Sequence, residues 1–273
     1  MVLGSQLRRL REAADISRAD AGYAIRGSES KISRMELGRV GFKQRDVADL
    51  LSLYGVHDPA ERELFLDMVA RANEPGWWYR YTDLMPSWFQ DYVGLEESAS
   101  RIQTYEVQFV PGLLQTEAYA TAIVTRGRPH DISDDARRRV ALRMRRQKLL
   151  TVPGAPRVWC VIDEAVLHRT IGGKEVMQQQ LDHLLEITRL PNVTLQVVPY
   201  ALSGYAAEGA FSLLRFAEAE LPDLVYIEHL TGALYLDKRD EIELYGRAAD
   251  QLAVDAETPE RTRRLLGRVR AEL

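Results

Sequence analysis

The 273-residue sequence lacks features that mark several protein classes. Its longest apolar runs fall far short of the roughly 20 residues that span a bilayer, and its start, MVLGSQLRRL, has no apolar signal core. We therefore expect a cytoplasmic protein without a membrane segment. Cys160 is the only cysteine, which excludes an internal disulfide and a cysteine-based zinc cluster. Its apolar surroundings, residues 158–162, predict a buried small side chain.

Catalytic and cofactor signatures are also missing. No glycine-rich turn joins a strand to a helix as in dinucleotide-binding proteins, and no Walker-type phosphate loop is present. No arrangement of a serine or cysteine nucleophile with histidine stands out. We therefore expect no enzyme activity, no catalytic residue, no cofactor and no metal site. The titratable side chains that we weighed as an alternative are Glu106, Glu117, Asp163, Glu164, His168, Glu208, Glu228 and His229.

One group among these titratable residues superficially resembles an acid–base or metal cluster. Asp163 and Glu164 end a candidate strand, and His168 follows a few residues later. Such spacings arise often by chance on exposed turns, so solvated charges or strand-end hydrogen bonds are the favoured interpretation. Glu228 and His229 alternate along a strand and cannot easily serve one site.

The most informative segment that is present is SRADAGYAIRGSESKISRMELG, residues 17–38. It predicts two short helices joined by a tight turn. Ser17 and Ser28 are suitable N-caps, and Gly38 is a suitable C-terminal stop. We expect Gly27 to supply backbone freedom at the turn, while Ile32 lies on the buried stripe of the second helix.

Helical patterns flank this unit at residues 3–14 and 43–54, and another begins at Pro59. The sequence therefore predicts a compact all-α head. Residues 1–45 contain ten Lys or Arg and five Asp or Glu, a local charge of +5, whereas the whole chain carries −4. Such a basic end on an acidic chain is expected where only that end meets phosphate.

The segment Lys31-Ile-Ser-Arg-Met-Glu-Leu-Gly38 resembles the end of the recognition helix in the lambda-repressor-type (XRE) helix-turn-helix family, and the resemblance covers roughly residues 3–55. It departs from the family at Arg26, where the turn glycine usually stands. The resemblance implies binding to double-stranded DNA through a helix in the major groove. The expected contact residues are Ser28, Glu29, Ser30, Lys31, Ser33, Arg34, Arg39 and Lys43.

Within this set, Arg34 has the reach for a bidentate contact to guanine. An internal ion pair with Glu12, Glu36 or another acidic neighbour is the alternative for this side chain. Lys43 follows the helix, where contact with the DNA backbone is expected. Because one such helix reads only a few base pairs, we also expect a homodimer.

The remaining chain alternates helical and strand patterns. A junction at residues 72–80 separates a head at 1–74 from a body at 75–273. Strands are expected near 101–110, 157–163, 193–198, 210–216, 224–228 and 233–236, and helices near 113–124, 174–190, 238–254 and 259–272. The predicted body is a mixed α+β domain with a small, mainly antiparallel sheet.

Two dense patches in the body have open interpretations. The aromatic cluster of residues 77–92 favours a core or a domain interface over a ligand cage. The basic run at residues 137–148 favours a solvated helix face, with a contact surface for an acidic partner or flanking DNA as the alternative. Val140 and Met144 still give that helix an apolar stripe.

The stretches PGWWYRYTDLMPSWFQDYVGLEESAS and YEVQFVPGLLQTEAYA resemble the C-terminal domain of a large actinobacterial regulator family with XRE heads. The resemblance extends to the C-terminus. It implies an antitoxin-like regulator with a small partner protein encoded beside it. We therefore expect a sequence-specific transcriptional regulator whose body binds a protein partner or small effector. An enzyme or nucleotide-handling domain fused to a DNA-binding head is the alternative.

Overall fold

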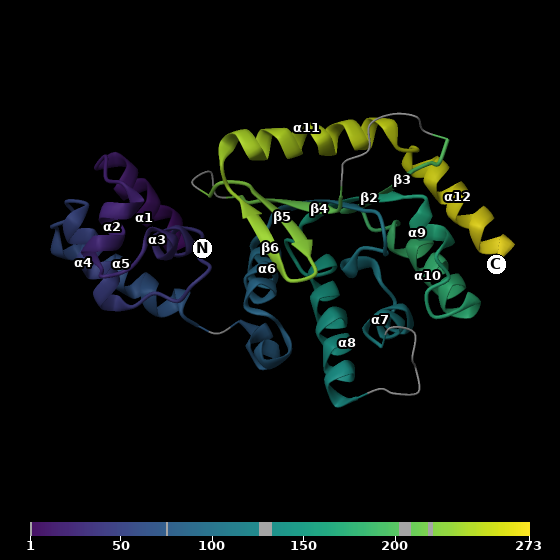
Figure 1. The fold of residues 1–273 in the computed structure, drawn as a ribbon, viewed down its shortest axis with the longest axis horizontal. Coiled ribbons are helices and arrows are strands. Elements are labelled where there is room, and N and C mark those ends of the chain that lie inside the picture. The colour runs from purple at the N-terminus through teal and green to yellow at the C-terminus, as the bar shows by residue number, and fades with distance from the viewer. Residues whose placement is uncertain (1, 75, 126–132, 202–208, 218–220) are drawn as a thin grey trace. The chain divides into compact units, whose positions relative to one another are not determined.

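A computed structural model describes residues 2–74, 76–125, 133–201, 209–217 and 221–273 (Figure 1). The chain separates into two compact units, one built around residues 1–77 and the other around residues 78–216 and 223–273. Each unit is described by itself. Among the described residues, no helix combines the length and the apolar character that crossing a bilayer requires.

The first unit is helical, as the sequence predicts. Ser17 begins α2, because its hydroxyl accepts a hydrogen bond from the backbone N–H of Asp20 at 3.0 Å. Ser28 begins α3 in the same way and accepts from the N–H of Lys31 at 3.2 Å. The five helices are α1 (Val2–Ala13), α2 (Arg18–Ala24), α3 (Glu29–Glu36), α4 (Gln44–Leu53) and α5 (Pro59–Ala72).

Two glycines let the helices of the first unit approach closely. A Cβ on Gly22 of α2 would lie 2.8 Å from the carbonyl carbon of Ser28, and a Cβ on Gly4 of α1 would lie 2.3 Å from the carbonyl oxygen of Met35. These contacts bring α1 and α2 directly against the two ends of α3. The core is formed by buried apolar residues: Leu3, Leu7, Ala21, Ile25, Ile32, Met35, Phe42, Val47, Leu50, Leu51, Tyr54, Val56, Phe65 and Val69.

The turn between α2 and α3 differs from the expectation in one respect. Arg26, not Gly27, has a positive φ, of 53°. The expected role of Gly27 is therefore wrong, since the left-handed conformation falls one residue earlier, at Arg26. The Cβ of Arg26 is sterically strained in that conformation. Gly38 has a φ of 66° and ends α3, which confirms its predicted role.

The second unit is a mixed α+β domain whose sheet is mainly antiparallel, as predicted, but larger than the small sheet expected. Six strands follow the order β3-β2-β1-β4-β5-β6. The β1/β2 and β2/β3 pairs are parallel, and the other three pairs are antiparallel. Their bounds are β1 (Arg101–Glu106), β2 (Arg157–Asp163), β3 (Val193–Val198), β4 (Phe211–Arg215), β5 (Leu224–His229) and β6 (Gly232–Leu236).

The parallel pairs follow from helical crossovers, which parallel neighbours require. Along the chain, α7 (Glu117–Val124) and α8 (Asp134–Gln147) connect β1 to β2, and α10 (Lys174–Ile187) falls in the connection from β2 to β3. The sequence analysis did not say which strands pair in parallel. The other helical elements are η1 (Trp77–Leu84), α6 (Ser87–Ser98), η2 (Gly112–Leu114), η3 (Lys148–Leu150), α9 (Ala165–His168), α11 (Arg239–Asp255) and α12 (Pro259–Glu272).

Helices cover both faces of this sheet. α11 runs along one face, and α6 and α8 lie on the opposite side (Figure 1). Under α11, Ala249 and Leu252 pack with Tyr105 and Phe211 in one apolar cluster. Alternate strand residues face opposite sides of a sheet. Glu106, which follows Tyr105 in β1, therefore faces α6 and α8.

Candidate nucleic-acid interface

The predicted contact residues on α3 form its solvent-facing side. Glu29, Ser30 and Arg34 are exposed and Ser33 is half-buried, whereas Ile32 on the opposite face is fully buried. Short polar groups and one long cation therefore face outward from a helix whose inner side is fixed in a core. A helix with this division fits a major groove.

A buried ion network fixes the C-terminal end of α3. The Glu36 side chain is only 2% exposed and accepts hydrogen bonds from Arg11 of α1 at 2.5 Å and from Arg18 of α2 at 3.0 Å. Burial alone lowers the pKa of Arg11, but the hydrogen bond and charge of Glu36 outweigh it and the pKa is raised. Three helices are thus joined at one carboxylate, which sets the orientation of α3.

Arg34 is available for contact with DNA. Its Nε donates only a long hydrogen bond, 3.4 Å, to the carbonyl of Ser30. The carboxylates weighed as internal partners are engaged elsewhere: Glu36 by the network above and Glu12 by Arg8 at 2.9 Å. Within the described parts of the chain Arg34 makes no ion pair, so the internal alternative is wrong.

Lys31 is placed differently from the other predicted contacts. Its ammonium group donates to the Asp46 carboxylate of α4 at 2.5 Å, and its side chain is 29% exposed. This ion pair links α3 to α4 in the free protein. A contact between Lys31 and DNA would have to compete with it, and stays a prediction.

The two cations after α3 have different surroundings. Lys43 is exposed and immediately precedes α4, and its side chain makes no hydrogen bond or ion pair with a described residue. Arg39 is half-buried and has interactions within the protein. Of the two, Lys43 is better placed for a phosphate.

Sequence reasoning missed Arg26 as a candidate contact, although it noted the residue. The side chain is exposed, lies two residues before the N-cap of α3, and has no partner among the described residues. A left-handed conformation costs a non-glycine residue free energy. The signal in the sequence was a cation at the position where the resemblance described above leads one to expect glycine.

The titratable residues at the end of β2 have structural roles. Asp163 caps the following turn by accepting from the N–H of Ala165 at 2.8 Å, and Glu164 accepts from the N–H of Tyr200 at 2.7 Å. His168 lies 3.4 Å from Glu164 and stacks on the Tyr200 ring. Strand-end hydrogen bonding, the favoured interpretation, is confirmed here. Glu208 lies outside the described residues.

The basic run of α8 does not form a uniform surface. Arg137 pairs with Asp134 at 2.7 Å on the outside, as a solvated face would. Arg146, in contrast, is buried and binds Glu96 of α6 through two hydrogen bonds of 2.8 and 2.7 Å. Arg143 also turns inward and donates to Gln115, so the run is not a solvated face throughout. A contact surface on its exposed arginines stays a prediction.

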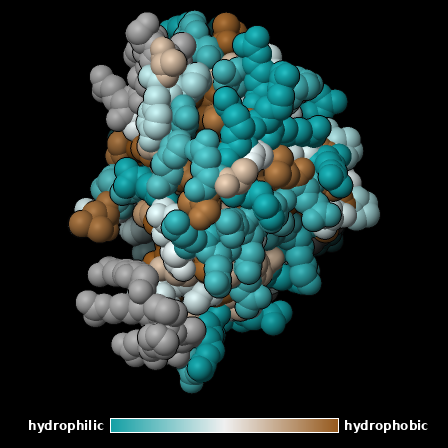
Figure 2. Space-filling model, turned by 90° about the vertical axis from the view of Figure 1, so that its right-hand side faces the viewer, coloured by the Kyte–Doolittle hydropathy of each residue, from teal (hydrophilic) through white to brown (hydrophobic). Residues whose placement is uncertain are grey.

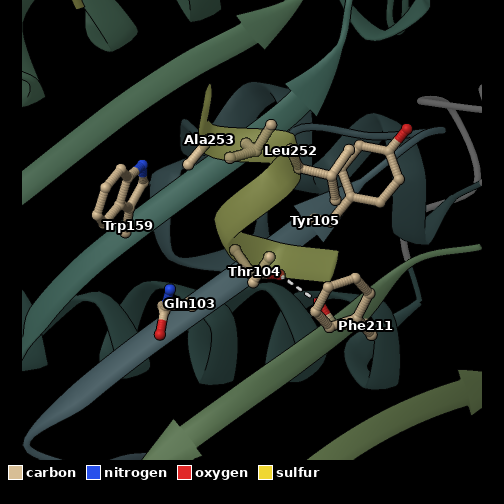
Figure 3. A pocket seen from close by; sticks show the side chains of 9 residues that line it. Gln103, Thr104, Tyr105, Trp159, Phe211, Leu252 and Ala253 are labelled. Atoms are coloured by element: carbon tan, nitrogen blue, oxygen red, sulfur yellow. Dashed lines mark hydrogen bonds between the residues drawn. The ribbon is translucent and has the colours of Figure 1, made fainter. Parts of the chain in front are cut away.

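A small void lies under α11, between the helix and the sheet (Figure 3). Its walls include Trp159, Phe211 and Leu252, and its volume is about 10 Å³. That is room for about one water molecule. This void is too small for an effector.

The outer face of the second unit that carries α10 and α12 is mostly hydrophilic (Figure 2). A shallow depression on α12 is lined by Arg261, Arg264 and Arg268, together with Glu257 and Leu265. Arg261 pairs with Glu257 at 3.6 Å. Arg264 and Arg268 are exposed and have no partner among the described residues.

Two family models match the chain. A helix-turn-helix domain matches residues 2–65, and a domain of unknown function, DUF5753, matches residues 89–268. The first match covers all five helices of the first unit except the end of α5. No significant match is found among curated proteins or among solved structures.

Proposed function

The chain belongs to the DUF5753 family and carries a helix-turn-helix domain, and from these premises we propose that it is a sequence-specific transcriptional regulator that binds double-stranded DNA through α3. The observation that carries the proposal is the division of α3 into an exposed polar side and a buried side anchored by Glu36. Rigid presentation of short polar side chains is what base-edge contacts require.

The proposed contacts divide by role. Glu29, Ser30 and Arg34 face base edges, and Arg34 is the side chain with the reach for guanine. Ser28, before α3, and Lys43, before α4, contact the sugar–phosphate backbone of the DNA. Ser33, Lys31 and Arg39 make additional contacts at the edge of the interface. The support is strongest for Glu29, Ser30 and Arg34, because all three side chains are exposed.

We extend the proposal to a cytoplasmic homodimer whose second domain is regulatory and antitoxin-like, without enzymatic activity. A two-fold DNA site would be read by two copies of α3. The domain would bind a small effector or a small protein encoded beside this gene. The exposed arginines of α12 support an acidic protein surface as one partner.

Sequence enrichment with the purified full-length chain on fragmented genomic DNA tests the central proposal. We expect a recurring site with two-fold symmetry, and weaker enrichment by Arg34→Ala than by Glu186→Gln, a charge change on the exposed side of α10. Enrichment of DNA without any common sequence would contradict sequence-specific regulation. Light scattering of the same sample measures the oligomeric state.

Co-purification from the native host in mild salt, with the neighbouring gene expressed, tests the protein partner. Recovery of the chain alone would contradict that part of the proposal. That outcome would not contradict the proposal of DNA binding, because partner binding and DNA binding are measured in separate experiments.

A further inference from the structure

Lys31 is a predicted DNA contact on α3 whose charge is engaged inside the protein. Its ammonium group donates to the Asp46 carboxylate at 2.5 Å and has no other hydrogen-bond partner among the described residues. Glu29 and Arg34, on the exposed side of α3, make no ion pair with any described residue. The ion pair therefore takes one cation of α3 out of the charge that this helix offers to DNA.

Asp46 has a nearer cation in the sequence but does not pair with it. Lys43 precedes α4, three residues before Asp46, and its exposed side chain has no partner within the described ranges. Asp46 lies in the first turn of α4, where the helix dipole favours a carboxylate, and its side chain is only 12% exposed. The carboxylate is thus fixed within the domain and is directed toward α3.

The aliphatic stem of Lys31 is also held in place. A Cβ on Gly27 would lie 2.9 Å from the Cδ of Lys31, so the stem passes directly over this glycine. Gly27 does not have a positive φ. Space for the lysine stem, and not backbone freedom, is therefore what a glycine provides at this position. The side chain follows one path, from the first turn of α3 over Gly27 to α4.

A released Lys31 would lie beside the proposed base contact. Lys31 is three residues before Arg34, and residues three apart are neighbours on the surface of a helix. Lysine is a point charge on a flexible stem, so its ammonium group can pair with any phosphate it reaches. Such a contact adds affinity for all DNA, whatever its sequence.

Burial decides whether the ion pair or a phosphate holds Lys31. One phosphate contact raises affinity about fivefold at about 0.15 M salt, and a fully exposed ion pair is worth about the same or less. The side chains of Lys31 and Asp46 are only 29% and 12% exposed, so salt screens their attraction less than it screens a contact on the DNA surface. The pair can therefore hold Lys31 against a single phosphate.

We propose that Asp46 is a specificity-determining residue, which withholds Lys31 from the phosphates of DNA in general. The ammonium group leaves Asp46 only at a site that offers it more than one acceptor, as guanine does with O6 and N7 in the major groove. Lys31 then adds to the binding of a cognate site and adds little to binding without sequence preference. The inference rests on the proposed DNA binding by α3, and it assigns a role to a residue of α4.

Fluorescence anisotropy of the full-length chain with a labelled duplex of random sequence tests the withholding of Lys31, and it needs no cognate site. Asp46→Asn is nearly isosteric and releases Lys31. It should bind this duplex more tightly than wild type and steepen the slope of log K against log salt by about 0.9. Its advantage over wild type should then grow about 3.5-fold as salt falls from about 0.2 M to about 0.05 M.

The double variant Lys31→Met with Asp46→Asn shows whether the gain comes from Lys31. It replaces the ion pair by two neutral side chains of similar size, so it should bind the random duplex with the slope of wild type. A slope about 0.9 shallower than that of wild type would show that Lys31 already contacts a phosphate, and would overturn the proposal. A gain equal to that of Asp46→Asn would also overturn it, because loss of the carboxylate charge would then be sufficient.

Asp49→Asn is the matched control for charge. It removes a carboxylate from the same helix, but Asp49 is half exposed and lies 3.9 Å from Arg45, which is itself exposed. It should leave the salt slope unchanged, and a slope as steep as that of Asp46→Asn would contradict a specific role for Asp46. Hydrogen exchange of α3 checks the fold of each variant. If Asp46→Asn loses protection there, Gly27→Ala replaces it, since the new Cβ displaces the Lys31 stem without changing any charge and should also strengthen binding to the random duplex.

The cognate site tests the second half of the proposal. Asp46→Asn and the double variant should both lower the ratio of cognate to random affinity, by about threefold or more, the first through tighter random binding and the second through weaker cognate binding. An unchanged ratio in both variants would overturn the role in specificity. If wild type prefers no sequence, the proposed function fails instead, and the random duplex still tests whether Asp46 withholds Lys31.

Discussion

Arg26 offers a prediction in which stability and DNA binding change in opposite directions. The residue holds a φ of 53° at the turn before α3, and its guanidinium is exposed. A left-handed conformation costs an L-residue about 1–2 kcal/mol. Glycine avoids this cost but loses roughly 0.5–1 kcal/mol through the greater entropy of its unfolded chain. Arg26→Gly should therefore stabilise the helix-turn-helix domain by about 0.5–1 kcal/mol.

The same change should weaken DNA binding. If the guanidinium contacts one phosphate, its loss lowers affinity for all sequences and reduces the slope of log K against log salt by about 0.9. Arg26→Ala separates the two effects, because it removes the cation but keeps a Cβ in the left-handed position. Arg26→Ala should weaken DNA binding as much as Arg26→Gly without the gain in stability.

Asp15→Gly is the matched control for the backbone effect. Asp15 is the other described non-glycine residue with a positive φ, of 54°, and lies between α1 and α2. It should stabilise the domain slightly, since Asp tolerates this conformation better than Arg. It should not weaken DNA binding, because it removes a negative charge.

Hydrogen exchange measured by mass spectrometry is the appropriate stability assay. All four tryptophans lie at residue 77 or later, outside α1–α5, so hydrogen exchange reports on these helices more directly than tryptophan fluorescence does. A gain of about 1 kcal/mol slows exchange from the open state roughly fivefold. Faster exchange in Arg26→Gly, or an unchanged salt slope in both Arg26 variants, would refute the reasoning.

Three further predictions concern the same domain. Glu36→Gln breaks a buried ion network and should lower the free energy of unfolding by about 3–5 kcal/mol. Glu12→Gln removes a charge from an exposed pair and should lower it by under about 1 kcal/mol. Equal effects of the two variants in urea unfolding, followed by hydrogen exchange, would contradict the proposed anchoring of α3 by Glu36. Gly22→Ala should destabilise by about 1–3 kcal/mol because its Cβ meets backbone, while Gly267→Ala in α12, with open space around it, should stabilise by up to about 1 kcal/mol; the two thermal shifts must differ in sign. Lys43→Ala should weaken binding about equally on all DNA and lower the salt slope by about one; an altered preference among sequences would show a base contact instead.

The first domain could be predicted largely from local sequence. The N-caps Ser17 and Ser28 and the stop at Gly38 act within a few residues, so their roles can be read from spacing alone. The anchoring of Glu36 by Arg11 and Arg18 could not, because it depends on how three helices pack. The ion pair of Lys31 with Asp46 was hidden for the same reason.

The second domain shows a wider gap between pattern and structure. The six strand positions follow from apolar runs, but strand order and direction depend on long-range pairing, so the order of the strands and the two parallel pairs were not predicted. Glu96 and Arg146 form a bidentate pair in the structure, although nothing in the sequence brings them together. The clue was the basic run of α8, whose arginines surround the helix; two of them, Arg143 and Arg146, turn toward the sheet.

The central claim is that the exposed side of α3 reads base sequence. The most direct test measures the affinity of wild type and Arg34→Ala for the enriched site and for a scrambled site of equal length, at several salt concentrations. The account predicts that Arg34→Ala reduces the ratio of the two affinities by about 1–3 kcal/mol, roughly 5- to 150-fold, while Lys43→Ala leaves the ratio unchanged. An intact ratio in Arg34→Ala together with a reduced ratio in Lys43→Ala would contradict it.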